Sequence, residues 1–377
     1  MKTDELIKKL FADEPCNTDR QTEIDIVKLI LIFDLVFCHC FLTCCSDERL
    51  STGLPYFMDT IWGGPLGADG FMMAMGVCMV YTRHGTPHRF AQRGIKLAVL
   101  GLLLNICRCT IPYLIGYALT GDYDKYMSTI VFETFENDIL MFAGLSFLLM
   151  ALLIQLKLRP FAILVLSLIM SGIATMLNGI DLHSVPANII AGHFIGTEDA
   201  PGQVHSYFTL LNWFAIPAFG NLYGYFYIRL KDKNTFHLIT GIPALLLANL
   251  YLISGVISRR GIFGDGELCY YHIGFFDIIG VMICTVAFYA VAFWLSLIVP
   301  ESIRSLAVNA GKHLTSVYFI QWIIIRVTVD IVLYNLRGST ELADWQIILL
   351  ALFILMLTVA VSACFQKLRR KVIQSNG

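Results

Sequence analysis

Long apolar runs separated by short polar segments are the dominant pattern of this 377-residue chain. Runs of about 20 residues suffice for a helix to cross a bilayer. The breaks between them carry glycine, proline and charge, as in "STGLPYFMDTIWGGPLG" and "GIFGDGEL". The pattern predicts an all-α polytopic membrane protein of about ten transmembrane helices, near 26–45, 65–82, 94–118, 130–156, 159–178, 207–229, 236–258, 272–298, 306–333 and 344–365.

The distribution of positive charge predicts the orientation of these helices. If the N-terminus lies inside, the loops on that side hold 17 of the 27 Lys and Arg residues, and the opposite loops hold 5. Cytoplasmic loops carry such an excess, so we expect both termini in the cytoplasm. The chain then divides into a cytoplasmic segment 1–25, with an amphipathic surface helix near 3–12, a transmembrane domain 26–366 and a basic tail 367–377.

Composition agrees with this class. The chain is 57% hydrophobic and 15% charged, with a mean hydropathy of +0.69, whereas soluble domains carry about 25% charged residues. The net charge of −1 indicates no particular partner besides membrane lipids, and we expect no nucleic acid. The oligomeric state stays open, a dimer included. Most of the 11 cysteines lie in apolar runs, and the consecutive Cys38, His39 and Cys40 point about 100° apart on a helix, so we expect no metal.

The first predicted span carries three ionisable side chains, Lys28, Asp34 and His39. Lys or Asp at the centre of a transmembrane helix costs about 2.5–3.5 kcal/mol on insertion scales, so these groups need a compensating role. Lys28 and His39 share one helical stripe with Leu35 and lie about 16 Å apart along the axis. The structural alternative is an interhelical hydrogen bond from His39 and a Lys28 side chain that reaches the headgroups. Asp34 lies on another face and is predicted to pair with a different span.

The spacing Lys28-x10-His39, preceded by Asp25, resembles the first helix of the acyltransferase 3 family, which has an Arg-x10-His signature. The segment Arg93-Gly-Ile-Lys96 occupies the place of that family's Arg-x-x-Arg motif. Two further stretches, "GADGFMMAMGVCM" (67–79) and "GKHLTSVYFIQW" (311–322), are similar to its second-helix and late segments. The matching positions in these two stretches are Asp69, Phe71, Gly76, Gly311, Tyr318 and Trp322.

Three other segments resemble the relatives of heparan-α-glucosaminide N-acetyltransferase, which belong to the same wider superfamily of transmembrane acyltransferases. They are "FAQRGIKLAVLGLLL", "NDILMFAGLSFLL" and "LLNWFAIPAFGNLYGYFYIR". The chain departs from the acyltransferase 3 pattern at four places. Lys28, Lys96 and Lys312 stand where that family has Arg, which keeps the charge but loses the bidentate fork, and Gln321 stands in place of a His.

The resemblance implies an acyltransferase that uses acetyl-CoA or another acyl-CoA as donor. Basic side chains at the cytoplasmic face would bind the donor phosphates: Lys28, Arg89, Arg93, Lys96 and Lys312. His39 would act as a general base or as a nucleophile, and burial should keep its imidazole neutral. Further substrate-side candidates are Asp69, Tyr318, Gln321 and Trp322.

Arg108 lies within a span, about 18 Å deeper than Lys96, and needs an acidic partner there. The candidates are Asp34, Asp69 and the cluster Glu133, Glu136 and Asp138. The arginine is either a structural ion-pair member or a stabiliser of the reacting carbonyl. We therefore group Asp34 with His39 and Arg108 as catalytic candidates.

The acceptor implied by the resemblance is a hydroxyl or amine of an extracytoplasmic glycan or lipid-linked sugar. The loop 179–206 would line its entry. We expect the protein to lie in a bacterial plasma membrane. Two other interpretations stay open. A transporter would also place ionisable groups at mid-depth, although we see no internal repeat. A catalytically silent, ligand-binding relative would explain the Lys and Gln replacements.

Overall fold

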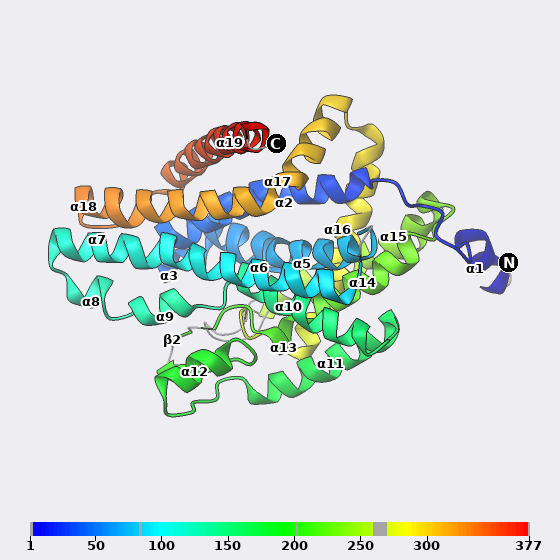
Figure 1. Ribbon diagram of the computed structural model, residues 1–377, viewed down its shortest axis with the longest axis horizontal. Coiled ribbons are helices and arrows are strands. Elements are labelled where there is room, and N and C mark those ends of the chain that lie inside the picture. Colours follow the sequence, from blue (N-terminus) through cyan, green and yellow to red (C-terminus); the bar gives the residue numbers. More distant parts are fainter. Residues whose placement is uncertain (1–2, 83–84, 201–202, 205, 259–269, 376–377) are drawn as a thin grey trace.

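The computed structural model describes residues 3–82, 85–200, 203–204, 206–258 and 270–375. Most of its helices run along the long axis of the molecule, side by side (Figure 1). Among the described residues, nine helical stretches are long and apolar enough to cross a membrane, and one of them, Tyr123–Gln155, is interrupted at 127–129 and at 136–138. They are Thr22–Cys44, Gly53–Val80, Pro87–Thr120, Tyr123–Gln155, Pro160–Leu177, Lys233–Gly255, Phe275–Ile298, Glu301–Arg337 and Asp344–Lys367. The prediction of an all-α polytopic membrane protein is confirmed.

These stretches are built from α-helices joined in places by short or π-helical segments (η), with one small antiparallel hairpin. The elements are α1 (Thr3–Leu10), α2 (Thr22–Cys44), α3 (Asp47–Leu50), α4 (Gly53–Tyr56), η1 (Phe57–Gly63), α5 (Gly64–Val80), α6 (Pro87–Asn105), η2 (Ile106–Thr110), α7 (Ile111–Thr120), α8 (Tyr123–Tyr126), α9 (Ile130–Phe135), α10 (Ile139–Gln155), α11 (Pro160–Leu177), α12 (Val185–Gly192), β1 (Glu198–Ala200), β2 (Gln203–Val204), α13 (Leu210–Trp213), α14 (Ala215–Tyr227), α15 (Lys233–Ser258), α16 (Phe275–Ile298), α17 (Glu301–Arg326), η3 (Val327–Leu333), α18 (Tyr334–Arg337) and α19 (Asp344–Ser375).

The predicted span 207–229 is not one continuous helix, which corrects the sequence prediction. It consists of α13 and α14, which meet at Phe214. Pro217 lies three residues into α14 and has no N–H to donate to the preceding turn, so the proline accounts for the break. The segment still crosses the bundle, because the Phe208 N–H donates to the Asn137 carbonyl at one end and the Tyr227 hydroxyl donates to Glu23 at the other.

Glycine lets α14 lie directly on α5. A Cβ on Gly220 would meet the Met73 carbonyl oxygen at 2.3 Å, and one on Gly76 would meet that of Pro217 at 2.1 Å. Small residues allow such backbone contact between membrane helices. Gly224 lies against Val77, four residues along from Met73, so α5 and α14 run in the same direction.

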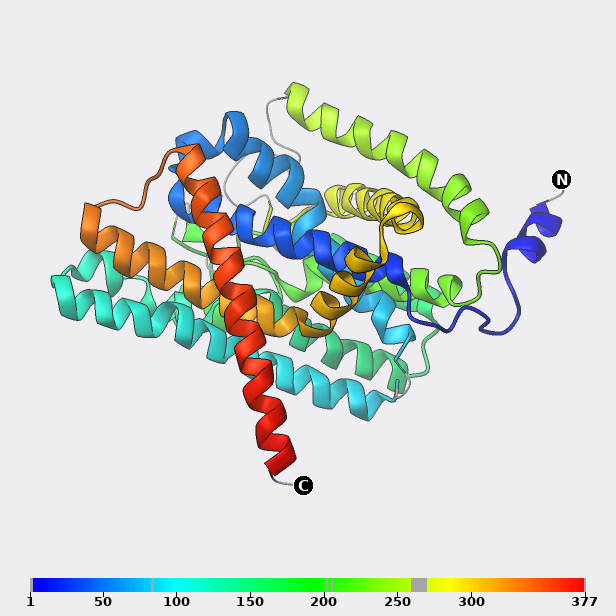
Figure 2. The same ribbon diagram turned by 90° about the horizontal axis from the view of Figure 1, so that it is seen from above.

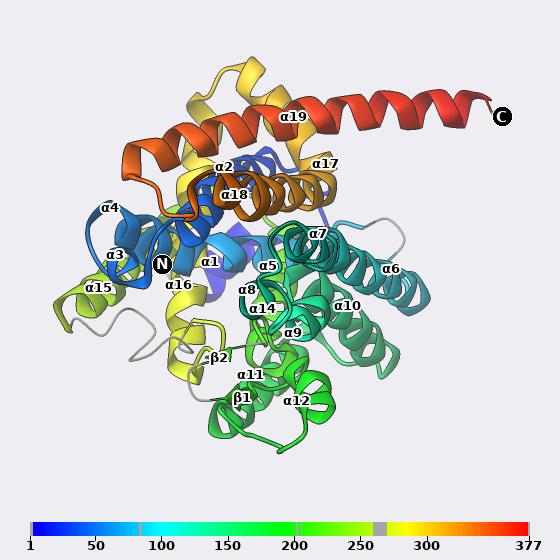
Figure 3. The same ribbon diagram turned by 90° about the vertical axis from the view of Figure 1, so that its left-hand side faces the viewer.

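Helix α2 occupies the middle of the bundle and packs against α5, α16, α17 and α19. An end-on view shows α2 and α17 together, with α6 and α7 beside them (Figure 3). Helix α19 differs from the others because it crosses over this group obliquely (Figure 2). Thus α2 and α17, which carry His39 and Gln321, are neighbours in space.

Local irregularity in the third span positions Arg108. The span contains a π-helical turn, η2, between α6 and α7, and Arg108 lies in that turn. A π turn holds an extra residue and changes the face that the following side chains occupy. Helix α10 lies against α6, where Gly94 and Gly144 bring the two backbones together, so residues just before α10 lie near η2.

Candidate active site

A cavity of about 220 Å³ lies between α2, α5, α6, α10 and α17. Three basic residues contribute to its lining, Lys28 from α2, Arg93 from α6 and Lys312 from α17. Lys28 donates from Nζ to Cys78 Sγ at 3.2 Å, and the Arg93 guanidinium lies 4.8 Å from the centre of the Phe147 ring. The rest of the wall is mostly apolar, with Phe71, Met72, Met75, Leu97, Phe142 and Phe147 among its residues.

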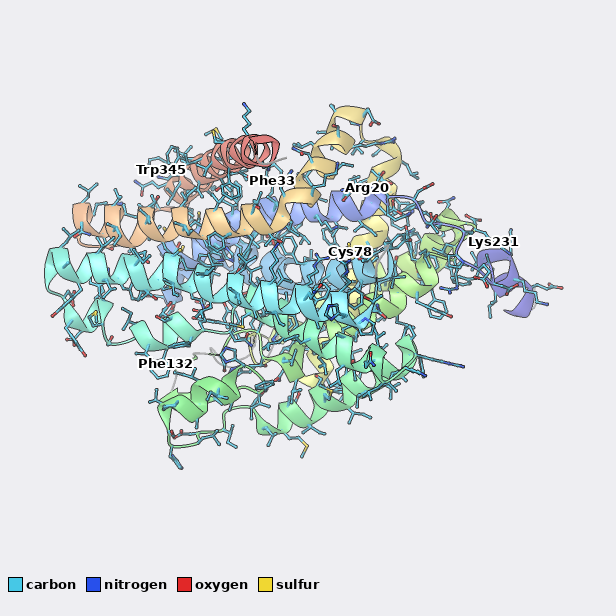
Figure 4. All side chains as sticks on the ribbon, viewed as in Figure 1. Arg20, Phe33, Cys78, Phe132, Lys231 and Trp345 are labelled. Carbon is cyan, nitrogen blue, oxygen red and sulfur yellow. The ribbon has the colours of Figure 1, made fainter. Side chains whose placement is uncertain are left out.

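We call the end of the bundle that holds Lys28 the Lys28 end. Cys78 lies toward it, as do Arg20 and Lys231, whereas Phe132 lies toward the opposite end (Figure 4). From Lys28 the cavity follows the predicted stripe of α2 to Leu35, and its lining also includes Ile139, Leu140 and Tyr318. His39 is the next residue of that stripe, one turn beyond Leu35. The cavity therefore leads from basic side chains toward the histidine.

His39 is partly exposed and lies against α17. Its Nδ1 is 3.0 Å from Nε2 of Gln321. The imidazole stacks on the indole of Trp322, with ring centres 3.9 Å apart and an angle of 29° between planes, and the Tyr318 ring meets it edge-on at 6.3 Å. Gln321 thus contacts Nδ1 and Trp322 covers one face of the ring, which leaves Nε2 as the nitrogen for chemistry.

Arg108 is buried in an ion-pair network beside this histidine. Its guanidinium lies 2.6 Å from Glu136 and 3.3 Å from Asp138, and it also lies over the Trp322 ring at 4.7 Å. The Tyr318 hydroxyl donates to both oxygens of Asp138, at 2.9 and 2.7 Å. Of the acidic partners predicted for Arg108, the cluster before α10 therefore supplies the pairs. A buried cation so paired can stabilise charge that develops nearby.

Sequence reasoning assigned no role to Arg326, which forms a second pair of this kind. Its guanidinium lies 2.8 Å from Glu133 and 3.1 Å from Asp330. The available signal was a charged residue within an apolar span, four residues after Trp322, with an acid four residues further on. The carboxylates around Arg108 and Arg326 come from the segment 133–138 and from η3, which only the tertiary structure brings together.

Other predicted residues lie away from His39. Asp34 and Asp69 are buried, and neither carboxylate has a hydrogen-bond partner within the described part of the chain. Asp34 lies against Gly67 rather than Arg108. Arg89 and Lys96 are exposed on α6 and do not contribute to the cavity lining.

The predicted acceptor loop, 179–206, holds a recess of about 10 Å³, too small for a sugar. His193 contributes to its lining, and its Nδ1 lies 2.8 Å from the Ile189 carbonyl oxygen. Burial lowers the pKa of His193, which favours the neutral ring. Hydrogen bonds from Asn188 and His183 lower the pKa of Asp181. His205, also part of this loop, lies outside the described residues.

These features define an integral, multi-pass membrane protein with a histidine and a buried charge network beyond one end of an apolar cavity. The family described as heparan-alpha-glucosaminide N-acetyltransferase, catalytic, matches residues 20–256, and the chain belongs to this membrane acetyltransferase family. Searches of curated proteins and of solved structures found no match.

The matched region begins before α2 and ends within α15, so it includes His39, Arg108, Glu136 and Asp138. It contains all three sequence segments that resembled this family, and that prediction is confirmed. It ends before α17, which supplies Gln321 to the site. The resemblance to the acyltransferase 3 family stays a prediction.

Proposed function

We propose that the protein transfers an acyl group, most simply acetyl, from acyl-CoA to a hydroxyl or amine on the far side of the membrane. The observation that carries this proposal is the cavity that runs from Lys28, Arg93 and Lys312 to Tyr318. A polyanion with a slim, uncharged arm, such as acyl-CoA, fits such a shape. The phosphates meet the cations at the mouth, and the arm carries the thioester inward.

We assign the acyl-transfer step to His39 and Arg108, which lie beyond the cavity. His39 removes the proton of the acceptor, whose oxygen or nitrogen attacks the thioester carbonyl while the bond to sulfur breaks. In the alternative route, His39 Nε2 attacks first and carries the acyl group to the acceptor. In both, the proton ends on the sulfur of CoA. Arg108 stabilises the oxyanion through the field of its guanidinium.

We further propose that the acceptor is a glycan or lipid-linked sugar, approaching from the end opposite Lys28, and that the protein lies in a bacterial plasma membrane. The His39 and Lys28 spacing supports a relationship with the acyltransferase 3 family within one superfamily. Two predicted donor residues, Arg89 from the basic cytoplasmic cluster and Lys96 from the family motif, are not needed in this arrangement because they lie outside the cavity lining.

The test is donor binding and turnover by purified protein in lipid nanodiscs. We expect acetyl-CoA to bind, CoA without an acyl group to compete, and free acetate to have no effect. With a membrane glycan extract, radiolabelled acetyl-CoA should transfer its label, and His39→Ala should bind donor without transfer. Absence of donor binding would contradict the proposal and favour a transporter. Binding without turnover in the native protein would identify a catalytically silent relative.

A further inference from the structure

Gln321 is the best placed residue to control the chemistry of His39. It is fully buried on α17, and its amide nitrogen is the group 3.0 Å from His39 Nδ1. The other end of the amide, Oε1, is buried without a hydrogen-bond partner among the described residues. A half-turn of the amide therefore brings Oε1 to the ring without moving either helix.

The two amide orientations require different forms of the imidazole. When the amide N–H donates to Nδ1, a neutral ring must carry its proton on Nε2, and that nitrogen is then a donor. When Oε1 accepts a proton from Nδ1–H, Nε2 has a free lone pair. Only the second form can act as a base or nucleophile at the accessible nitrogen.

We propose that Gln321 is a positioning residue that sets which ring nitrogen of His39 carries the proton, with Oε1 accepting from Nδ1–H in the reactive form. A neutral amide suits this task, since it directs the proton without adding a negative charge that would favour the imidazolium. The inference rests on the proposed function only for its kinetic consequence. The tautomer itself is a property of the protein alone.

The surroundings of His39 contain other charged or titratable groups that affect its protonation. Arg108, over the Trp322 ring on which His39 stacks, and Arg326, one turn after Trp322 on α17, are cations that both oppose a positive charge on the imidazole. Each of these arginines is paired with carboxylates that moderate this effect. Besides the two arginines, the titratable groups are the chain neighbours Cys38 and Cys40 on α2, Tyr318 on α17, which meets the ring edge-on, and the carboxylates paired with the arginines, which are Glu133 on α9, Glu136 and Asp138 before α10, and Asp330 on η3.

The direct test is nitrogen NMR of protein labelled at the histidine ring nitrogens, in nanodiscs. The chain has 9 His residues, and a His39→Asn variant identifies the His39 signals. We expect Gln321→Glu, whose carboxylate only accepts, to hold the Nδ1–H form. Gln321→Leu should release the ring to a different mixture of tautomers. Identical tautomer populations in the native protein, Gln321→Leu and Gln321→Glu would overturn the proposal, whether or not the protein transfers acyl groups.

Kinetics supply the second readout. Gln321→Leu should lower kcat about 10²-fold or more, with an unchanged KM for acyl-CoA. Gln321→Glu should stay active, but its loss of activity on the acidic side should begin about 1 pH unit or more higher, because the carboxylate favours the imidazolium. Ser171→Ala on α11, which also removes a buried polar atom without a described partner, is the control and should change neither quantity. A pH profile of Gln321→Glu that superimposes on the native one would contradict the assignment.

Discussion

The Tyr318 hydroxyl donates to Asp138 across 180 residues of sequence, and this contact joins the cavity to the buried ion pairs. Tyr318 contributes to the cavity lining, whereas Asp138 pairs with Arg108 at 3.3 Å. A ligand that reaches Tyr318 therefore contacts a group already coupled to the Arg108 charge. The hydrogen bond fixes the relative positions of α17 and the start of α10 at the depth where chemistry is proposed.

The first prediction concerns His39 itself. His39→Gln can keep a side-chain hydrogen bond but cannot take up a proton, so we expect acyl transfer to fall about 10²–10⁴-fold, as for removal of a general acid–base group. Donor affinity should be unchanged, since Lys28, Arg93 and Lys312 line the cavity and His39 lies beyond it. Turnover of labelled acetyl-CoA and equilibrium binding measure the two quantities. A well-folded His39→Gln variant that retains most of its turnover would remove this residue from the mechanism.

The second prediction separates cavity cations from surface cations. Lys28→Ala should weaken acyl-CoA binding about tenfold or more, because it removes a charged partner of the donor phosphates. Lys28→Arg should bind normally. Lys96→Ala is the matched control, since Lys96 is exposed on α6 outside the cavity lining. Isothermal titration in nanodiscs measures the affinities. Equal losses in the Lys28→Ala and Lys96→Ala variants would contradict the assignment of the cavity as donor site.

The third prediction concerns stability. Arg108→Met leaves Glu136 and Asp138 buried without their cation, and breaking a buried pair in this way costs about 3–5 kcal/mol. We expect a large fall in the thermal unfolding midpoint in detergent. Neutralising the partners as well, through Glu136→Gln and Asp138→Asn, should restore part of it.

The control for this prediction is Arg304→Met. Arg304 is partly exposed, lies 3.9 Å from Glu301 and donates to the Ser296 carbonyl oxygen at 2.9 Å; such a surface pair contributes about 0–1 kcal/mol and a hydrogen bond about 0.5–1.5 kcal/mol, less than a broken buried pair. The Arg304→Met variant should unfold close to the native temperature. If Arg108→Met were no more destabilising than Arg304→Met, the ion pairs at Glu136 and Asp138 would not be formed in the membrane.

The fourth prediction concerns orientation. The charge asymmetry predicts that the C-terminal cluster Lys367–Lys371 and the segment 83–93 are cytoplasmic. Arg83 itself lies outside the described residues. Single cysteines introduced at Arg89 and at Lys367 in a cysteine-free background should be protected from an impermeant thiol reagent in intact cells. Labelling of either position from outside would reverse the direction from which the donor is proposed to enter.

The sequence by itself determined the class of protein and most of its spans. Apolar length is a local property, because a helix in lipid must satisfy its own backbone, so runs near 20 residues identify spans without knowledge of their neighbours. The same holds for the stripe from Lys28 to Leu35 and His39, which follows from helical geometry within one element. The break between α13 and α14 was missed, although Pro217 was a local signal for it.

Tertiary structure alone decided which charges meet. Asp34 and Glu136 were both possible partners of Arg108 by depth, but only Glu136 pairs with it. The π turn that contains Arg108 and the packing of α6 on α10 place the guanidinium beside Glu136. Gln321 contacts His39 for the same reason, because α17 packs on α2 and brings together two residues 282 positions apart in the sequence. Hydropathy indicates how deep a residue lies in the membrane. The partner of a side chain depends also on the rotation of its helix and on which helix packs beside it, and neither can be read from the apolar pattern of one sequence.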